Sequence, residues 1–258
     1  MAEAIQFQDG ETYESMMGVW SALVGAPFLD WLDVPAGAKW ADIGCGNGAS
    51  TELIVERAQP ALVEGIDPSE AQLAYARRRH QAGVARFTLG SALELPYSDS
   101  AFDAAIMALV IFFVPEPARG AAEMRRVVRS GGVVAAYAWD LEGGGFPYED
   151  VHFALSEAGV EALLPPHPEV ARLDALHRLW TDAGLVDVET REITASRAFP
   201  SFDAYWSTAT NAPGIGQVLP KLSAEQLEHV RNSVQAPRGS GEWVARGRVH
   251  AVRGRVPN

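Results

Sequence analysis

The sequence predicts an α/β fold in which a mostly parallel sheet has helices on both faces. Two observations predict it. Strand-like and helical segments alternate over residues 39–139, which is the pattern of parallel strands joined by crossover helices. The segment VVAAYAW, residues 133–139, is apolar almost throughout, as expected for a strand that is covered on both faces. We expect each crossover to be right-handed.

The first part of the alternating region contains three predicted strands and two predicted helices. The predicted strands are Lys39–Ile43, Ala61–Asp67 and Ala85–Leu89. A helix follows the first strand through about Ala58. The second helix lies within residues 68–80, because Ser69 and Gln72 have the spacing of a capping box, which satisfies free amides of a first helical turn.

The second part begins with a predicted strand at Phe102–Ala108. Residues 115–132 predict a helix, with Pro117 near its first turn and Gly131-Gly132 at its end. The segment 133–139 is the fifth strand.

The regular alternation of predicted strands and helices ends after Trp139. Residues 140–150 are rich in glycine and predict a loop, and Val186–Ile193 predicts another strand. Residues 199–234 are aromatic at first and then helical. Apolar and polar residues alternate over 243–256, a pattern typical of a half-exposed, antiparallel edge strand.

Three glycines follow the first strand at every second position, and Asp42 lies two residues before the first of them. Ligands of open parallel sheets bind beyond the carboxyl ends of the strands, which is where these residues lie. Gly44, Gly46 and Ala49 satisfy the G-x-G-x-x-G/A pattern of dinucleotide sites. However, the Asp42 carboxylate would repel a pyrophosphate and attract an ammonium or sulfonium group. The pattern therefore favours a cationic nucleoside ligand over a dinucleotide.

A second acid, Asp67, ends the second strand, 23 residues after Gly44. A carboxylate at this position can accept hydrogen bonds from both ribose hydroxyls. This residue predicts a nucleoside ligand but does not separate the two ligand classes.

Four segments, ADIGCGNG, EGIDPS, LGSALELPYSDSAFDAA and EMRRVVRSGGVV, resemble in order and spacing the signature segments of class I S-adenosylmethionine-dependent methyltransferases. The resemblance covers roughly residues 35–140 and is greatest to small-molecule enzymes of the quinone-biosynthesis type. It implies a Rossmann-like sheet of seven strands with the last strand antiparallel, and S-adenosyl-L-methionine as the cofactor. It also implies a single domain with a helical cap from residues 1–35, a cofactor-binding core at 36–140 and a substrate-lid insertion at 194–235.

The resemblance also implies roles for individual residues. The residues expected around the cofactor are Asp42, Gly44 and Gly46 at the methionine part, Asp67 with Pro68 and Gln72 at the ribose, Ser91, Ala92 and Leu93 along the adenine, and Ala108 at the methionine end. Relatives commonly have an aspartate in place of Ser91, whose hydroxyl can accept a hydrogen bond but carries no charge.

Aromatic and methionine side chains outside the signature segments predict a small, apolar or aromatic methyl acceptor, because such side chains line most ligand pockets. The candidates are Tyr13, Met16, Met17, Trp20, Phe112, Phe113, Trp139, Phe202, Tyr205 and Trp206. Each could instead be an ordinary core residue. Methyl transfer from a sulfonium needs alignment more than a catalytic side chain. Asp140 and His152 are candidate bases, and Phe112-Phe113 exclude a base where relatives often have histidine.

Two alternatives remain at this point: a cofactor-binding or regulatory protein without turnover, and an NAD-dependent oxidoreductase. The net charge of -12 argues against a nucleic-acid partner. The single cysteine, Cys45, and the absence of a leader-like N-terminus predict a cytoplasmic protein. The longest apolar run, residues 104–114, is too short to span a membrane, and the histidines and cysteine show no metal-binding spacing.

Overall fold

A seven-stranded sheet runs through the computed structural model, which describes residues 5, 18–80, 83–212, 214–237 and 241–258. Its strand order is β3-β2-β1-β4-β5-β7-β6. The strands are β1 Lys39–Ile43, β2 Leu62–Asp67, β3 Ala85–Leu89, β4 Phe102–Ala108, β5 Val128–Trp139, β6 Val186–Phe199 and β7 Trp243–Arg255. The first five are parallel, and β7 is antiparallel to both β5 and β6. The predicted fold class and the antiparallel last strand are confirmed.

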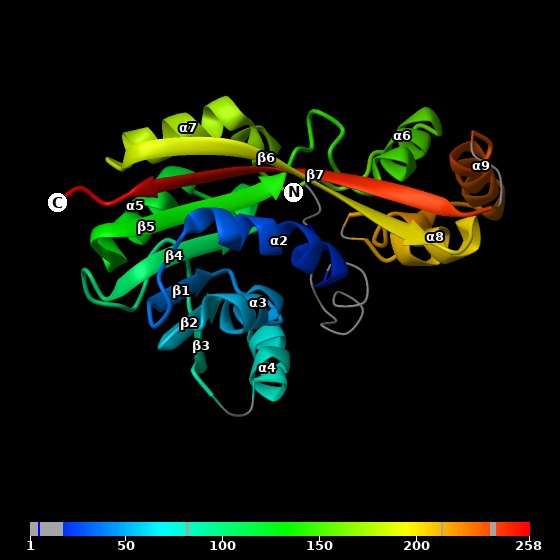
Figure 1. The fold of residues 1–258 in the computed structure, drawn as a ribbon. Helices are drawn as coiled ribbons and strands as arrows, with labels where there is room; N and C mark the ends of the chain where they lie inside the picture. The colour runs from blue at the N-terminus through cyan, green and yellow to red at the C-terminus, as the bar shows by residue number, and fades with distance from the viewer. Residues whose placement is uncertain (1–4, 6–17, 81–82, 213, 238–240) are drawn as a thin grey trace.

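Helices cover both faces of this sheet, as Figure 1 shows. The helices are α2 Val19–Leu32, α3 Ala49–Ala58, α4 Glu70–Arg79, α5 Pro117–Val127, α6 Glu149–Glu157, α7 Leu173–Asp182, α8 Phe202–Ala209 and α9 Ala224–Gln235, with short 3-10 helices η2 Ile111–Phe113, η3 Pro168–Ala171 and η4 Leu219–Lys221. Helices α2, α3 and α4 lie on one face, and α5 and α7 lie on the other. Helices α6, α8 and α9 gather where β6 and β7 project beyond the other strands (Figure 1).

Side-chain caps mark where three of these helices begin, α4, α8 and α9. The hydroxyl of Ser69 accepts a hydrogen bond from the Gln72 amide at 3.4 Å, which is one half of the predicted capping box. The Ser69 amide donates instead to the Asp67 carboxylate. At α9, Ser223 and Gln226 form a complete capping box. Such caps satisfy amides that have no partner inside the helix.

The predicted helix over residues 115–132 is too long, because α5 ends at Val127 and β5 begins at Val128. Gly131 and Gly132 therefore lie inside the strand. A Cβ atom on Gly132 would lie 2.6 Å from the carbonyl oxygen of Asp103. Glycine is needed here because β5 approaches β4 closely, and the register between these strands shifts at this point.

The expectation that residues 243–256 form an edge strand is wrong, because β7 lies between β5 and β6. Its first half alternates because there it extends past β5, whereas residues 249–252 are all buried. The edge position belongs to β6, which continues six residues beyond the predicted Ile193 and pairs with β7 as far as Phe199. The helices between the two strands therefore begin at Phe202.

One apolar core joins the sheet to the helices on both faces. Trp180 of α7 is fully buried in it and donates a hydrogen bond from its indole nitrogen to the carbonyl of Val134 at 2.9 Å. This side chain fastens α7 to the centre of the sheet.

We expect Trp180→Ala to lower the free energy of unfolding by about 3–5 kcal/mol, because the substitution leaves a large cavity and removes a buried hydrogen bond. Urea denaturation measures this change. Phe153→Ala is the control, since Phe153 is 64% exposed, and its effect should stay within about 0.5 kcal/mol. Equal effects of the two substitutions would contradict this account of the core.

Candidate functional site

A cleft with a volume of about 250 Å³ opens at the carboxyl ends of β1, β2, β3 and β4. The loops that follow these four strands form it, together with Ser21 of α2. Its lining comprises Ser21, Gly44, Cys45, Gly46, Asn47, Ala49, Ser50, Ile66, Asp67, Pro68, Ser69, Gln72, Gly90, Ser91, Ala92, Leu93, Ala108, Leu109, Val110, Phe113, Val114 and Pro115. The structure thus brings together every predicted cofactor residue except Asp42.

The glycine loop after β1 borders the cleft with its main chain. Gly44 has a φ of +75°, and a Cβ atom there would lie 2.5 Å from a methyl group of Val110. Gly46 also has a positive φ, +52°, but a Cβ atom there would meet nothing within 4 Å. Gly44 is therefore required by packing as well as conformation. Gly46 leaves open space in which a ligand can approach the backbone.

Asp67, at the end of β2, holds this loop in place. One carboxylate oxygen accepts a hydrogen bond from the Gly46 amide at 2.9 Å, and the other accepts one from the Ser69 amide at 2.8 Å. Burial raises the pKa of this carboxyl group, and the two hydrogen bonds oppose that effect. Each oxygen retains acceptor capacity toward the cleft, which the predicted ribose contact requires.

Asp42, at β1, does not line the cleft. Its carboxylate is fully buried, and one oxygen accepts hydrogen bonds from the hydroxyls of Ser50 at 2.7 Å and Thr51 at 2.6 Å. The other oxygen has no hydrogen-bond partner among the described residues. The pKa of Asp42 is raised to about 6, chiefly by burial and to a smaller extent by the nearby Asp67, while hydrogen bonds from the two hydroxyls lower it.

The strip after β3 forms one side of the cleft. The Ser91 hydroxyl accepts a hydrogen bond from the Leu93 amide at 3.2 Å, which shapes this turn.

Cys45, on the glycine loop, is buried, and burial raises the pKa of its thiol, so it stays protonated.

The segment after β4 forms an apolar wall at the other side. Its lining residues are Leu109, Val110, Phe113, Val114 and Pro115. Leu109 adopts a positive φ of 61°, an uncommon conformation for this residue type, and its amide donates to the carbonyl of Tyr137 at 2.8 Å. Phe113 is the one predicted acceptor-site aromatic among the described residues that lines the cleft. The sequence did not single out the rest of this wall, because apolar residues after a buried strand give no distinct signal.

Most of the predicted acceptor-site aromatics lie elsewhere. Trp20, Phe112, Trp139, Phe202, Tyr205 and Trp206 are all at most 9% exposed, and none of them lines the cleft. The Trp20 indole nitrogen donates to the Tyr148 hydroxyl at 3.1 Å, and its ring lies 6.1 Å from that of Trp139. These contacts place Trp20 in a buried aromatic cluster. Tyr13, Met16 and Met17 lie outside the described residues.

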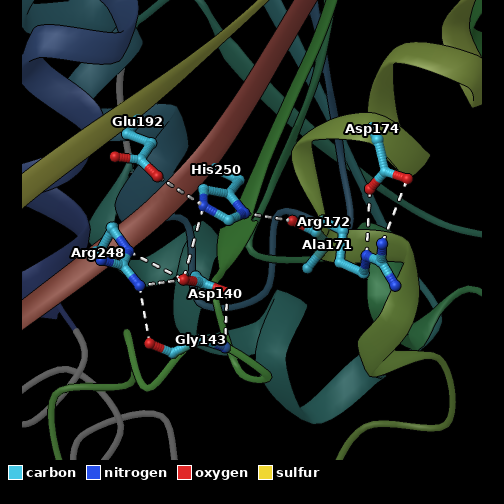
Figure 2. Close-up of polar contacts among 8 residues, drawn as sticks. All are labelled: Asp140, Gly143, Ala171, Arg172, Asp174, Glu192, Arg248 and His250. Carbon is cyan, nitrogen blue, oxygen red and sulfur yellow. Dashed lines mark hydrogen bonds and ion pairs between the residues drawn. The ribbon is translucent and has the colours of Figure 1, made fainter.

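The candidate base Asp140 is held by a polar network, shown in Figure 2. Its carboxylate accepts from Arg248 Nε at 2.9 Å and from the Gly143 amide at 2.9 Å. The same carboxylate lies 3.6 Å from His250 Nε2. Asp140 therefore fastens the loop after β5 to β7 and does not line the cleft.

The second candidate base, His152 of α6, is also away from the cleft. Its ring stacks on Phe146 with centroids 4.9 Å apart, and burial lowers its pKa to about 4. The imidazole is therefore neutral at pH 7. Among the described residues, no three metal-ligating side chains lie close enough to bind an ion. None of the helices in the described ranges has both the length and the apolar character needed to cross a membrane.

The fold and this cleft define a class of protein, the Rossmann-like domains that bind a nucleoside beyond the ends of their strands. Residues 41–136 match the family model of the methyltransferase domain. A demethylmenaquinone methyltransferase from Bacillus velezensis is 29% identical over 184 residues, which are 65% of this chain and 79% of that protein. Over these residues the chain is therefore similar to S-adenosylmethionine-dependent methyltransferases.

Two further comparisons differ in coverage. An uncharacterized 37.1 kDa protein in transposon TN4556 of Streptomyces fradiae is 36% identical over 116 residues, which are 43% of this chain; the match covers about a third of that protein, 34%. The structure of phosphoethanolamine N-methyltransferase 2 from Haemonchus contortus, in complex with S-adenosyl-L-methionine, has a TM-score of 0.59 and 15% identity. That comparison covers 96% of this chain and 56% of the other. At this identity the likeness shows the fold alone.

We expect Asp42→Asn to change how stability depends on pH. The folded-state pKa of about 6 lies above the ordinary value of 3.8, so the native protein binds more protons than the unfolded chain between these values. The stabilisation from this group is full below about pH 4 and is lost as the pH rises through 6. Its loss amounts to on the order of 3 kcal/mol.

Urea denaturation at several pH values from 4 to 7 measures the difference between wild type and variant. Glu70→Gln, at an exposed carboxylate of α4, controls for the change in net charge. If wild type and Asp42→Asn lose stability in parallel across this range, the pKa of Asp42 in the folded protein is not raised.

Proposed function

We propose that this protein transfers the methyl group of S-adenosyl-L-methionine to a small, apolar or aromatic acceptor. The observation that supports it most is the position of Asp67, whose carboxylate lies in the same cleft as the open main chain of Gly46. Together they suit a nucleoside whose ribose faces the acid and whose amino-acid end lies along the glycine loop.

The electrostatics of the cleft favour this ligand over a dinucleotide. Asp42 and Asp67 are close enough for the second to raise the pKa of the first. A pyrophosphate over this loop would add negative charge beside two carboxylates, whereas a sulfonium and an ammonium would offset them. The residues present therefore fit S-adenosylmethionine and oppose NAD.

The cofactor, when bound, supplies a methyl group on a positively charged sulfur. The protein then has to orient an acceptor lone pair in line with it and exclude water. The wall from Leu109 to Pro115 would exclude water and hold an apolar acceptor. Neither Asp140 nor His152 lines the cleft, so an acceptor that needs no protein base suits it best. We further propose that the chain acts as one unit, with residues 1–35 and the insertion before β7 covering the acceptor side.

Calorimetric titration with S-adenosylmethionine, S-adenosylhomocysteine and NAD tests the cofactor. We expect heat from the first two and none from NAD. Incubation with S-adenosylmethionine and a panel of apolar, aromatic and polar acceptors, followed by mass spectrometry, then tests transfer. Binding without transfer to any acceptor would indicate a regulatory protein, and binding of NAD alone would overturn the proposal.

We expect Asp67→Ala to weaken S-adenosylhomocysteine binding by about 1.5–3 kcal/mol, the usual range for hydrogen bonds to a charged group. Asp67→Asn should lose less, because its amide oxygen still accepts. Asp203→Ala, at an exposed carboxylate of α8, is the control. Unchanged affinity in Asp67→Ala would show that this acid does not contact the ligand.

A further inference from the structure

Ser50 places a hydroxyl of fixed polarity in the cleft. It lies in the first turn of α3, it is half-buried, and it lines the cleft beside the glycine loop. Its only hydroxyl hydrogen is donated to the Asp42 carboxylate at 2.7 Å. What remains on the oxygen is lone pairs, so Ser50 can accept a hydrogen bond from a ligand but cannot donate one.

Thr51 makes the same bond without facing the cleft. Its hydroxyl donates to the same oxygen of Asp42 at 2.6 Å, but the residue is fully buried and does not line the cleft. The chain thus contains two hydroxyls that bind Asp42 equally, of which only one can reach a ligand.

We propose that Ser50 binds the ammonium group of the cofactor, and that Asp42 is a positioning residue that acts through it. This rests on the proposed function. An ammonium has three N–H donors and no acceptor, which complements an oxygen that can only accept. The sulfonium has no N–H to donate. The buried charge of Asp42, one hydrogen bond away, adds an attraction that the low dielectric of its surroundings strengthens.

This assignment differs from the prediction made from sequence, in which Asp42 itself surrounds the methionine part. In the structure the Asp42 carboxylate is fully buried and does not line the cleft, whereas Ser50, which donates to it, does. The acid can still favour a cation, but only the serine can contact it.

Calorimetry with three probes tests this role. S-Adenosylmethionine and S-adenosylhomocysteine both contain the ammonium group, whereas 5′-methylthioadenosine contains the nucleoside and a thioether but neither the ammonium nor the carboxylate. The missing carboxylate is no partner for Ser50, whose hydroxyl hydrogen is already donated to Asp42. We expect Ser50→Ala to weaken binding of the first two on the order of tenfold or more, and to leave the third unchanged. Thr51→Val should leave the ratio of the three affinities at its wild-type value. Ser50→Thr keeps the hydroxyl that Ser50→Ala removes, so it should bind the three probes as the wild type does.

Each other outcome overturns the proposal in a different way. Equal weakening of all three probes by Ser50→Ala would assign Ser50 a structural role. Weakening of S-adenosylmethionine alone would move the contact to the sulfonium. Unchanged affinities in Ser50→Ala, with normal wild-type binding, would overturn this inference and leave the proposed function intact. Failure of the wild-type protein to bind either cofactor form would overturn both.

Discussion

Three main-chain amides of the loop after β1 donate hydrogen bonds to the end of β2. Gly44 and Cys45 donate to the Ile66 carbonyl at 2.7 and 3.1 Å, and Gly46 donates to the Asp67 carboxylate. The loop is therefore pulled toward the neighbouring strand and cannot fold across the ends of the sheet. The cleft stays open because these amides find their hydrogen-bond acceptors on the neighbouring strand β2, and not within the loop itself.

The same interaction sets the charge of the site. Asp67 is needed to hold Gly46, and Asp42 is needed to hold the hydroxyls at the start of α3. Two carboxylates thus lie under and beside one short loop, each with its pKa raised by burial. A positively charged ligand would relieve their mutual repulsion, so the contacts that build the loop also favour the cationic cofactor.

The sequence was most informative where one physical constraint acts alone. The bounds of β1, β3 and β4 were predicted correctly, since each is a short strand in the regular alternation of strands and helices. The end of α5 was not, because Gly131-Gly132 serve a close approach between strands, which local pattern cannot distinguish from a helix stop. The order of β6 and β7 was missed because alternation reports half-exposure, not position in a sheet.

The site residues were also predicted best where a residue type at a given position has few alternative roles. Glycines and acids at strand ends have few other uses, so nearly all the cofactor residues were predicted to lie together and do. Aromatic residues are as common in cores as in pockets, and Trp20, Trp139 and Tyr205 lie in the buried cluster around α6 and α8. Asp140 looked like a free carboxylate because Arg248, its partner, is 108 residues away in sequence.

The position of β7 between β5 and β6 has a consequence for how the chain reaches this structure. Because β6 is made before β7 but pairs only with it, its 14 residues have no strand to join until the chain through Arg255 is available. β5 must keep the edge facing β7 open for as long. Ordering of this part of the sheet therefore depends on contacts between distant residues, a feature that slows folding and leaves strand edges exposed for longer.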